Sequence, residues 1–329
     1  MGLPNPALKL IVREHKRKAF TGPVLTLGRQ YVFDTLEGVQ QLLIAENISP
    51  AILPSHENTL TNVPNWIGTP NEKNTSDVIF FKLLGLTDIH AMDYSDFENA
   101  DIVHDLNTPV PDEFKNRFDL IVDGGTIEHV FDIKQDLINI ATMLRPGGRI
   151  IHMTPMNNYV NHGFYQFSPT LFFDYYGVNA FADLRGYLVD SYWRHAREPW
   201  ELFELTPTAE IASDHFLNAM LVAFWAEKTP DSTVDKVPLQ SVYQQMYQKA
   251  VQNTPKEEAE PISQATTKGQ ITSKKAPFRQ WVPMRIKAIL NRGLGFLREI
   301  WNCLNERIWD SPHYSHRKKP WGLKRVGRL

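Results

Sequence analysis

The sequence is poor in cysteine and in long apolar runs. Its single cysteine, Cys303, has no partner for an internal disulfide, which fits a reducing compartment. No apolar run approaches the roughly 20 residues that span a bilayer. Residues 1–22 are basic and lack the apolar stretch of a secretory signal. With 329 residues, 42% of them hydrophobic, the chain is long enough to bury a full-sized core, and we expect a soluble, globular, cytoplasmic protein.

Acidic residues are scarce at the end of the chain. From Ser273 onward there are 14 Lys and Arg against three acidic residues, and the preceding part holds 21 basic and 34 acidic residues. The formal net charge of −2 therefore hides an acidic body and a basic end. The two parts are expected to have different roles.

The most informative stretch is residues 118–155. Residues 120–122 are an apolar run that stops at Asp123, Gly124 and Gly125, as expected of a strand buried on both faces. A helical pattern of apolar residues follows over 137–144, then a Pro-Gly-Gly stop at 146–148 and a second strand over 149–153. A β-α-β unit of this kind builds a parallel sheet, with ligands bound outside the carboxyl ends of its strands.

The same alternation extends over a domain that we place at residues 23–230. Further strands are expected at 23–27, 88–92, 100–104, 187–192 and 216–225, and further helices at 33–48, 76–84 and 167–176. Gly28, Asp93 and Asp105 then come directly after the first three of these strands. The prediction is an α/β fold with helices on both faces of a mostly parallel sheet.

The two ends of the chain read differently from this domain. Residues 1–22 look like a basic lead-in, and residues 231–283 like a polar linker with a possible short helix at 242–251. Residues 284–309 place apolar residues on one helical face and arginines mostly elsewhere, which is typical of an amphipathic cationic helix. Residues 310–329 form a basic tail.

The domain resembles the class I S-adenosylmethionine-dependent methyltransferases, in particular the small-molecule type. The resemblance rests on the strand at 118–122, the Ile-Glu-His-Val turn at 127–130 and Leu-Arg-Pro-Gly-Gly-Arg at 144–149, and it covers about residues 20–230. It implies a Rossmann-like sheet of seven strands, the last ones in an antiparallel hairpin. It also implies S-adenosylmethionine as the cofactor, bound across the first four strands.

The resemblance assigns cofactor contacts to the strand ends. Asp93 would hold the two ribose hydroxyls, since a carboxylate accepts two hydrogen bonds side by side. Asp105 and the amide of Leu106 would contact adenine, and the loop at 123–126, with Asp123, Gly124 and Gly125, would lie near the methionyl part. Each aspartate alone is equally compatible with a helix cap or a turn.

The first strand departs from the family pattern. The family usually carries Gly-x-Gly-x-Gly at this point, whereas this chain has Gly28-Arg29-Gln30-Tyr31. Arg29 could pair with the carboxylate of the cofactor, and Tyr31 could face its sulfonium. The alternative is that the fold persists as a scaffold without cofactor.

The acceptor side is predicted from His129, His162 and Tyr165. His129 lies in the turn after the fourth strand, and a histidine bound to structure is the competing interpretation. His162 and Tyr165 lie in a polar and aromatic loop, which suits a substrate and also ordinary loop packing. No metal is predicted, because Gly125 stands where metal-binding relatives carry the first glutamate of Glu-x-x-Glu-His.

The sequence therefore predicts a methyltransferase acting on an oxygen or nitrogen of a small molecule, sugar or glycan- or lipid-linked precursor. The alternative is a non-catalytic module of the same fold, recruited by its tail. For residues 284–329 we expect docking on an anionic membrane, peripheral at its inner face. Nucleic acid and the protein's own acidic domain are the competing partners.

Overall fold

The computed structural model describes residues 2–54, 74–190, 200–206, 219–253 and 324–328. The chain divides into one unit of residues 1–253 and 320–329 and a second of residues 254–319. All described residues belong to the first unit. The predicted amphipathic helix at 284–309 and most of the linker and tail lie outside the described residues.

The described elements follow an alternating order, apart from the last strands. The strands are β1 (Gly2–Leu3), β2 (Val24–Leu27), β3 (Tyr31–Thr35), β4 (Asn74–Ser76), β5 (Ile89–Asp93), β6 (Ile102–Val103), β7 (Phe118–Asp123), β8 (Leu144–Asn157), β9 (Ala182–Asp190), β10 (Glu201–Leu205), β11 (Met220–Glu227) and β12 (Lys324–Arg328). The helices are α1 (Asn5–Arg17), α2 (Leu36–Ala45), α3 (Asp77–Leu83), α4 (Ile133–Met143), α5 (Pro169–Val178) and α6 (Ser241–Asn253), with short 3-10 helices η2 (Asp112–Phe114) and η3 (Ile127–His129).

The main sheet is mostly parallel, as predicted. Its order is β12-β10-β9-β11-β8-β7-β2-β5-β6. The five strands from β8 to β6 pair in parallel, and β11 is antiparallel to both β8 and β9. The seven predicted strands all lie in this sheet, but the described residues give nine, because β10 and β12 extend it beyond β9.

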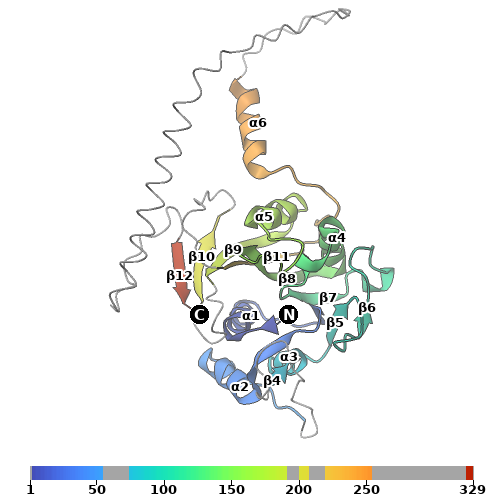
Figure 1. Ribbon diagram of the computed structural model, residues 1–329, viewed down its shortest axis with the longest axis vertical. Helices are drawn as coiled ribbons and strands as arrows, with labels where there is room; N and C mark the ends of the chain where they lie inside the picture. Colours follow the sequence, from blue (N-terminus) through green and yellow to red (C-terminus); the bar gives the residue numbers. More distant parts are fainter. Residues whose placement is uncertain (1, 55–73, 191–199, 207–218, 254–323, 329) are drawn as a thin grey trace, which may run out of the picture. The chain divides into compact units, whose positions relative to one another are not determined.

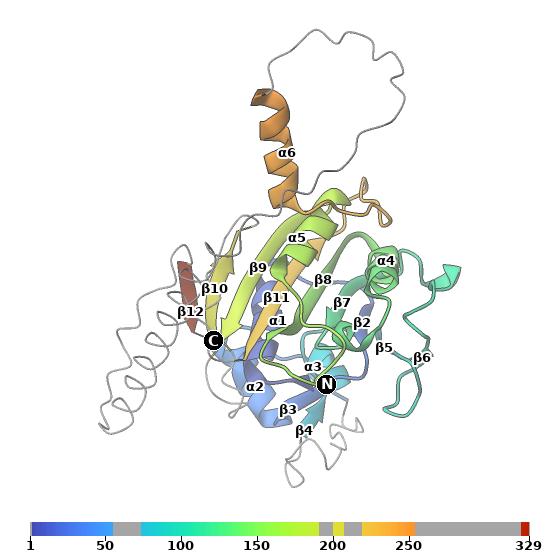
Figure 2. The ribbon, with the colours of Figure 1, turned by 45° about the horizontal axis from the view of Figure 1, so that its top comes forward.

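Helices α4 and α5 cover one face of the main sheet and α1, α2 and α3 the other (Figures 1 and 2), and alternating residues of the buried strands pack in the two cores between. Ile121 of β7 packs in the cluster that holds residues of α4 and α5, and its neighbours Leu120 and Val122 pack in the cluster with α1, α2 and α3. This period of two explains why residues 120–122 form an unbroken apolar run. Among the described residues, every helix is too short or too polar to traverse a bilayer.

The amino-terminal lead-in is a correction to the sequence prediction. Residues 5–17 form α1, whose Leu8, Ile11 and Val12 are buried against the second core. The helical spacing of these three residues was masked by the basic residues between and after them. Residues 33–35, predicted as the start of a helix, instead form the end of β3, which pairs with β1 and β4 in a second sheet of three strands.

Other boundaries shift only slightly. The helix at 76–84 is confirmed as α3, and the hydroxyl of its cap Ser76 accepts from the amide of Ile79. The helix before Pro146 ends at Met143, so the Pro-Gly-Gly segment belongs to the entry of β8 rather than to the helix end. The predicted short helix at 242–251 is α6.

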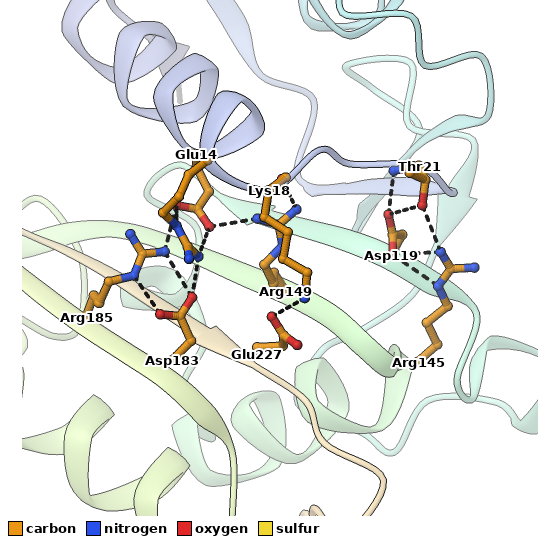
Figure 3. A network of polar contacts seen from close by, with 10 residues as sticks. Glu14, Lys18, Thr21, Asp119, Arg145, Arg149, Asp183, Arg185 and Glu227 are labelled. Carbon is orange, nitrogen blue, oxygen red and sulfur yellow. Dashed lines mark hydrogen bonds and ion pairs between the residues drawn. The ribbon is translucent and has the colours of Figure 1, made fainter.

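The amino ends of strands β7, β8 and β9 carry a network of ion pairs (Figure 3). The buried carboxylate of Glu14 in α1 accepts from Arg149 at 2.7 Å and from Arg185 at 2.6 Å. Asp119 accepts from Arg145 at 2.7 Å and from the amide of Thr21 at 2.8 Å. These contacts fasten the first residues of the chain to the sheet and leave the opposite edge for a site.

Candidate functional site

The predicted site residues meet at the carboxyl edge of the sheet. Gly28 follows β2, Asp93 ends β5, Asp105 follows β6 and Asp123 ends β7. Because β6, β5, β2 and β7 are parallel neighbours, the loops that follow them lie at one edge, as predicted. The turn after β2 is sharp, since Gly28 has a φ of 67° and its amide donates to the carbonyl of Met92.

Asp93 keeps one carboxylate oxygen free of contacts with the described residues. Its Oδ1 accepts from the amide of Tyr94 at 2.6 Å, and the side chain is half-buried. Asp105 is half-buried and acts as a turn residue, because its Oδ1 accepts from the amide and side chain of Asn107. These hydrogen bonds lower the pKa of Asp105. Leu106 is buried, and its carbonyl accepts from Asn139.

Arg29 is held by contacts within the chain. Its guanidinium donates to the buried Asp77 at 3.2 and 3.3 Å and reaches Asp101, which does not support the predicted pairing with a cofactor carboxylate. Burial raises the pKa of Asp77, and the charge of Arg29 opposes that rise. Asp77 begins α3 and belongs to no motif, so sequence reasoning missed it. Arg29 therefore ties the β2 turn to α3.

Tyr31 is likewise occupied. The side chain is nearly fully buried in β3, and its hydroxyl donates to Glu98 at 3.0 Å. Burial and the neighbouring carboxylate of Glu98 raise the pKa of Tyr31 to about 12. The hydroxyl is therefore fixed by the protein, which does not support the predicted contact with a sulfonium.

Gln30 lies between the loops after β2 and β7. It is 1% exposed, and its Nε2 donates to the carbonyl of Leu27 at 2.7 Å. Its Oε1 is buried without a hydrogen-bond partner. A Cβ added to Gly124 would lie 2.4 Å from this oxygen and 3.3 Å from the side chain of Leu3. A side chain at position 124 would therefore require the amide of Gln30 to move.

Asp123 organises the β7 loop from within. Its Oδ1 accepts from the amide of Thr126 at 2.8 Å, and its Oδ2 lies 2.8 Å from Nδ1 of His152. His152 in turn lies 2.8 Å from the hydroxyl of Tyr176. Both Asp123 and His152 are fully buried. The polar chain was invisible in the sequence, since His152 lies within an apolar strand.

The acceptor-side residues converge on Glu128. Nε2 of His162 lies 3.4 Å and Nε2 of His129 lies 3.9 Å from Oε1 of Glu128. The rings of His129 and His162 are 5.1 Å apart. Tyr165 does not join them through its hydroxyl, which donates to the carbonyl of Phe131 at 2.8 Å. The structure thus brings two of the three predicted residues together.

The electrostatics of this group are unusual. Burial raises the pKa of Glu128, an effect that Asp123 strengthens and His162 opposes. Burial and the proximity of His162 lower the pKa of His129, so its imidazole is neutral at pH 7. A neutral imidazole can accept a proton or bind a metal ion. No pattern of residues around Glu128 indicated that it would be fully buried.

Similar solved structures are described as methyltransferases. A possible histamine N-methyltransferase from Thermotoga maritima is 14% identical, with a TM-score of 0.33 over 68% of this chain and 90% of that one. A Burkholderia thailandensis 1,6-didemethyltoxoflavin N1-methyltransferase, solved with S-adenosylhomocysteine, is 12% identical, with a TM-score of 0.33 over 68% and 78%.

A Haemonchus contortus phosphoethanolamine N-methyltransferase is 12% identical, with a TM-score of 0.35 over 68% of this chain and 54% of that one. No family model matches the sequence, and no curated protein is similar to it. The strand order and the antiparallel β11 give the Rossmann-like α/β sheet with an antiparallel strand that the sequence resemblance implies.

Proposed function

We propose that the protein is an S-adenosylmethionine-dependent methyltransferase acting on an oxygen or nitrogen of a small molecule, sugar or glycan- or lipid-linked precursor. One observation carries the proposal: the half-buried carboxylate of Asp93 ends β5 beside the turn at Gly28. A carboxylate at this position suits a pair of ribose hydroxyls. The loop after β2, residues 28–30, contains Gln30, whose buried side-chain oxygen has no hydrogen-bond partner among the described residues.

The residues at the edge fit the cofactor in part. The orphaned Oε1 of Gln30 is an acceptor for an ammonium group, and Gly124 lets the chain approach it closely. Asp93 and the Leu106 amide would hold the nucleoside, and Gly28, Gln30, Gly124 and Gly125 the methionyl part. When bound, S-adenosylmethionine supplies a methyl group activated by a sulfonium.

The chain's own residues would align the acceptor and take its proton. The His129 and His162 side chains are 41% and 38% exposed, so an acceptor can reach them from solvent. Neutral His129 can accept a proton from a hydroxyl or an ammonium as the nucleophile forms. Methyl transfer is a displacement at carbon, so positioning supplies much of the acceleration.

The test is calorimetry of the pure protein with S-adenosylmethionine and S-adenosylhomocysteine. We expect saturable binding that Asp93→Ala weakens by at least about tenfold, since one carboxylate hydrogen-bonded to two hydroxyls contributes about 1.5–3 kcal/mol. Asp96→Ala is the matched control, because Asp96 is an exposed aspartate of the same loop. Absence of binding, or equal binding by both variants, would overturn the proposal.

The non-catalytic module is the second candidate. Two observations favour it: Arg29 pairs with Asp77, and the side chains of Gln30 and Leu3 lie close to Gly124. These side chains fill the loop region in which the family's glycines usually leave room for the cofactor. It predicts no calorimetric signal with either ligand. The same titration therefore separates the two functions.

A docking role for residues 284–329 stays a proposal. Only 324–328 of this range are described, and they form β12, antiparallel to β10. This pairing supports the competing interpretation that the tail docks on the protein's own domain. Flotation with anionic vesicles, comparing the full chain with Arg317→Gln/Lys318→Gln/Lys319→Gln, tests the membrane. Failure of the full chain to float would exclude it, and filter binding with RNA tests nucleic acid.

A further inference from the structure

Three metal-ligating side chains meet outside the expected cofactor contacts. Glu128 and His129 lie in η3 after β7, and His162 lies in the loop after β8, 33 positions further along the chain than His129. One ligand atom of each residue lies within 4.8 Å of the others. The group comes from two loops, so the spacing of residues in the sequence did not predict it.

Glu128 is the unusual member. Its side chain is 0% exposed, and neither carboxylate oxygen has a hydrogen-bond partner in the described part of the chain. The approach of His162 at 3.4 Å does not have hydrogen-bond geometry. A buried carboxylate without compensation is costly, and proteins rarely retain one unless a cation or proton accompanies it.

Two glycines, Gly125 and Gly163, lie close to Glu128. A Cβ at Gly125 would lie 3.0 Å from Oε1 of Glu128, and a Cβ at Gly163 would lie 2.7 Å from its carbonyl oxygen. That carbonyl also accepts from the amide of Phe164 at 2.8 Å, which holds the His162 loop against η3. The two histidines are therefore the close neighbours of the carboxylate. A side chain at position 125 would crowd it.

From this geometry we infer that Glu128, His129 and His162 bind one divalent transition-metal ion. Bonds of about 2.0–2.2 Å from zinc to nitrogen or oxygen hold neighbouring ligand atoms about 3–4 Å apart. The distances of 3.4 and 3.9 Å from Oε1 to the two imidazole nitrogens are of this size. Rotation of the half-exposed imidazoles would also bring one nitrogen of His129 and one nitrogen of His162 to about 3–4 Å from each other, as the same ion requires.

The ligand set selects the kind of ion. Two imidazoles and one carboxylate suit zinc, iron, nickel or copper, whereas magnesium and calcium prefer oxygen ligands alone. The sequence prediction excluded a metal because position 125 is not a glutamate. In the proposed site His162 supplies a ligand in place of that glutamate. Two nitrogen ligands instead of two carboxylates shift the preference from magnesium to a softer ion.

Three protein ligands leave at least one coordination position open. Phe131 and Phe164, both more than 60% exposed, form an edge-to-face pair next to the ligands in sequence. If the proposed methyltransferase function holds, the open position takes a hydroxyl oxygen of the acceptor, and the ion lowers the pKa of that hydroxyl. In the metal-bound protein His129 is then a ligand rather than the base, and the hydroxyl proton passes to water. Metal binding itself does not rest on the proposed function.

The experiment is metal titration of the full chain after stripping with a chelator. Zn²⁺ binding is followed by calorimetry and Co²⁺ binding by its visible absorption, which reports nitrogen ligation. We expect one equivalent for the wild-type chain, with affinity reduced at least about 100-fold in His162→Ala and Glu128→Gln. His313→Ala/His316→Ala is the control for binding by tail histidines and should keep that equivalent.

Each outcome decides the inference. Binding of one equivalent that is lost in His162→Ala and kept in the tail variant supports it. No saturable binding, equal affinity in wild type and His162→Ala, or tighter binding of Mg²⁺ than of Zn²⁺ overturns it. His162 is half-exposed, so His162→Ala should fold, and circular dichroism checks this. Cofactor calorimetry runs without metal, so failure of one proposal is distinguishable from failure of the other.

Discussion

Glu14 in α1 and Glu128 in η3 are both buried glutamates packed at the edges of the main sheet, and they differ in what surrounds them. Glu14, near the amino ends of the strands, is 2% exposed and accepts from Arg17, Arg149 and Arg185 (Figure 3). Glu128, at the carboxyl edge, is 0% exposed and has no hydrogen-bond partner among the described residues. Burial of Glu14 is compensated by three arginines, whereas burial of Glu128 is offset only in part, by His162.

The difference distinguishes the edge that ion pairs hold together from the edge that carries the candidate site. Burial raises the pKa of Glu14, but hydrogen bonds from Arg17 and Arg185 outweigh it, so the pKa is lowered. Burial raises the pKa of Glu128 without equal compensation. Perturbed and unpartnered groups gather where a ligand binds, whereas paired charges hold elements together. Ion pairs therefore hold the strands together at their amino ends, and the candidate site lies at their carboxyl ends.

The largest effect is expected at the fastened end. Glu14→Gln removes the charge that faces Arg149, itself only 3% exposed, and should lower the free energy of unfolding by about 3–5 kcal/mol. Urea denaturation measures it. Glu37→Ala, at an exposed glutamate of α2, is the control and should change stability by less than about 0.5 kcal/mol. A loss below about 1 kcal/mol for Glu14→Gln would contradict the structural role.

A smaller effect on stability, and a stabilising one, is expected from substitution of Asp136 in α4. This carboxyl is fully buried without a hydrogen-bond partner, and burial, with Asp123 nearby, raises its pKa well above 3.8. Its stability contribution is therefore complete below pH 3.8 and lost as the pH rises toward the folded pKa, at up to about 1.4 kcal/mol per pH unit. Asp136→Asn does not titrate and escapes this loss.

Denaturation at pH 4 and pH 7 tests this sign. The stability of Asp136→Asn relative to the wild type should rise by about 1–3 kcal/mol between the two pH values. Asp132→Asn removes the exposed N-cap carboxylate of the same helix, so it should change in the opposite direction or little. A constant difference for Asp136→Asn across this pH range would show that the carboxyl is ionised in the folded protein.

The direct counterpart of the Glu14 experiment is Glu128→Gln in chelator-stripped protein. Removing an uncompensated buried charge should leave stability unchanged or raise it by about 1–2 kcal/mol. Added Zn²⁺ should then stabilise the wild-type chain and not the variant, since only a ligand of the folded state shifts the transition. Thermal denaturation with and without Zn²⁺ measures both. A destabilisation as large as that of Glu14→Gln would erase the contrast between the two edges.

Much of the fold could be predicted because it depends on local patterns. The apolar run at 120–122, its stop at Asp123 and the helical spacing after it needed no knowledge of partners. The segments that failed depend on distant contacts. Residues 31–35 became β3 because β1 and β4 lie on either side of that strand. Helix α1 forms although it carries many basic residues, of which Arg13 pairs with Glu46 and Arg17 with Glu14.

The site was predictable only as far as topology determines it. Asp93 and Gly28 lie where parallel strands had to deliver them. The engagement of Arg29 by Asp77, and the meeting of His162 with Glu128, depend on side chains brought together from 48 and 34 positions apart by the sequence numbering. Neither pairing leaves a periodic signal, so no reading of spacing could recover them.

The smallest effect concerns Tyr165, whose predicted role was catalytic. Its hydroxyl donates to the carbonyl of Phe131 at 2.8 Å, so it connects the His162 loop to the turn after η3. Tyr165→Phe should cost about 0.5–1.5 kcal/mol, the usual net contribution of one hydrogen bond. Tyr94→Phe, at a 75% exposed tyrosine, should cost nothing measurable. If Tyr165→Phe matches this control in thermal denaturation, the hydroxyl does not hold the loop, and a role toward the acceptor regains support.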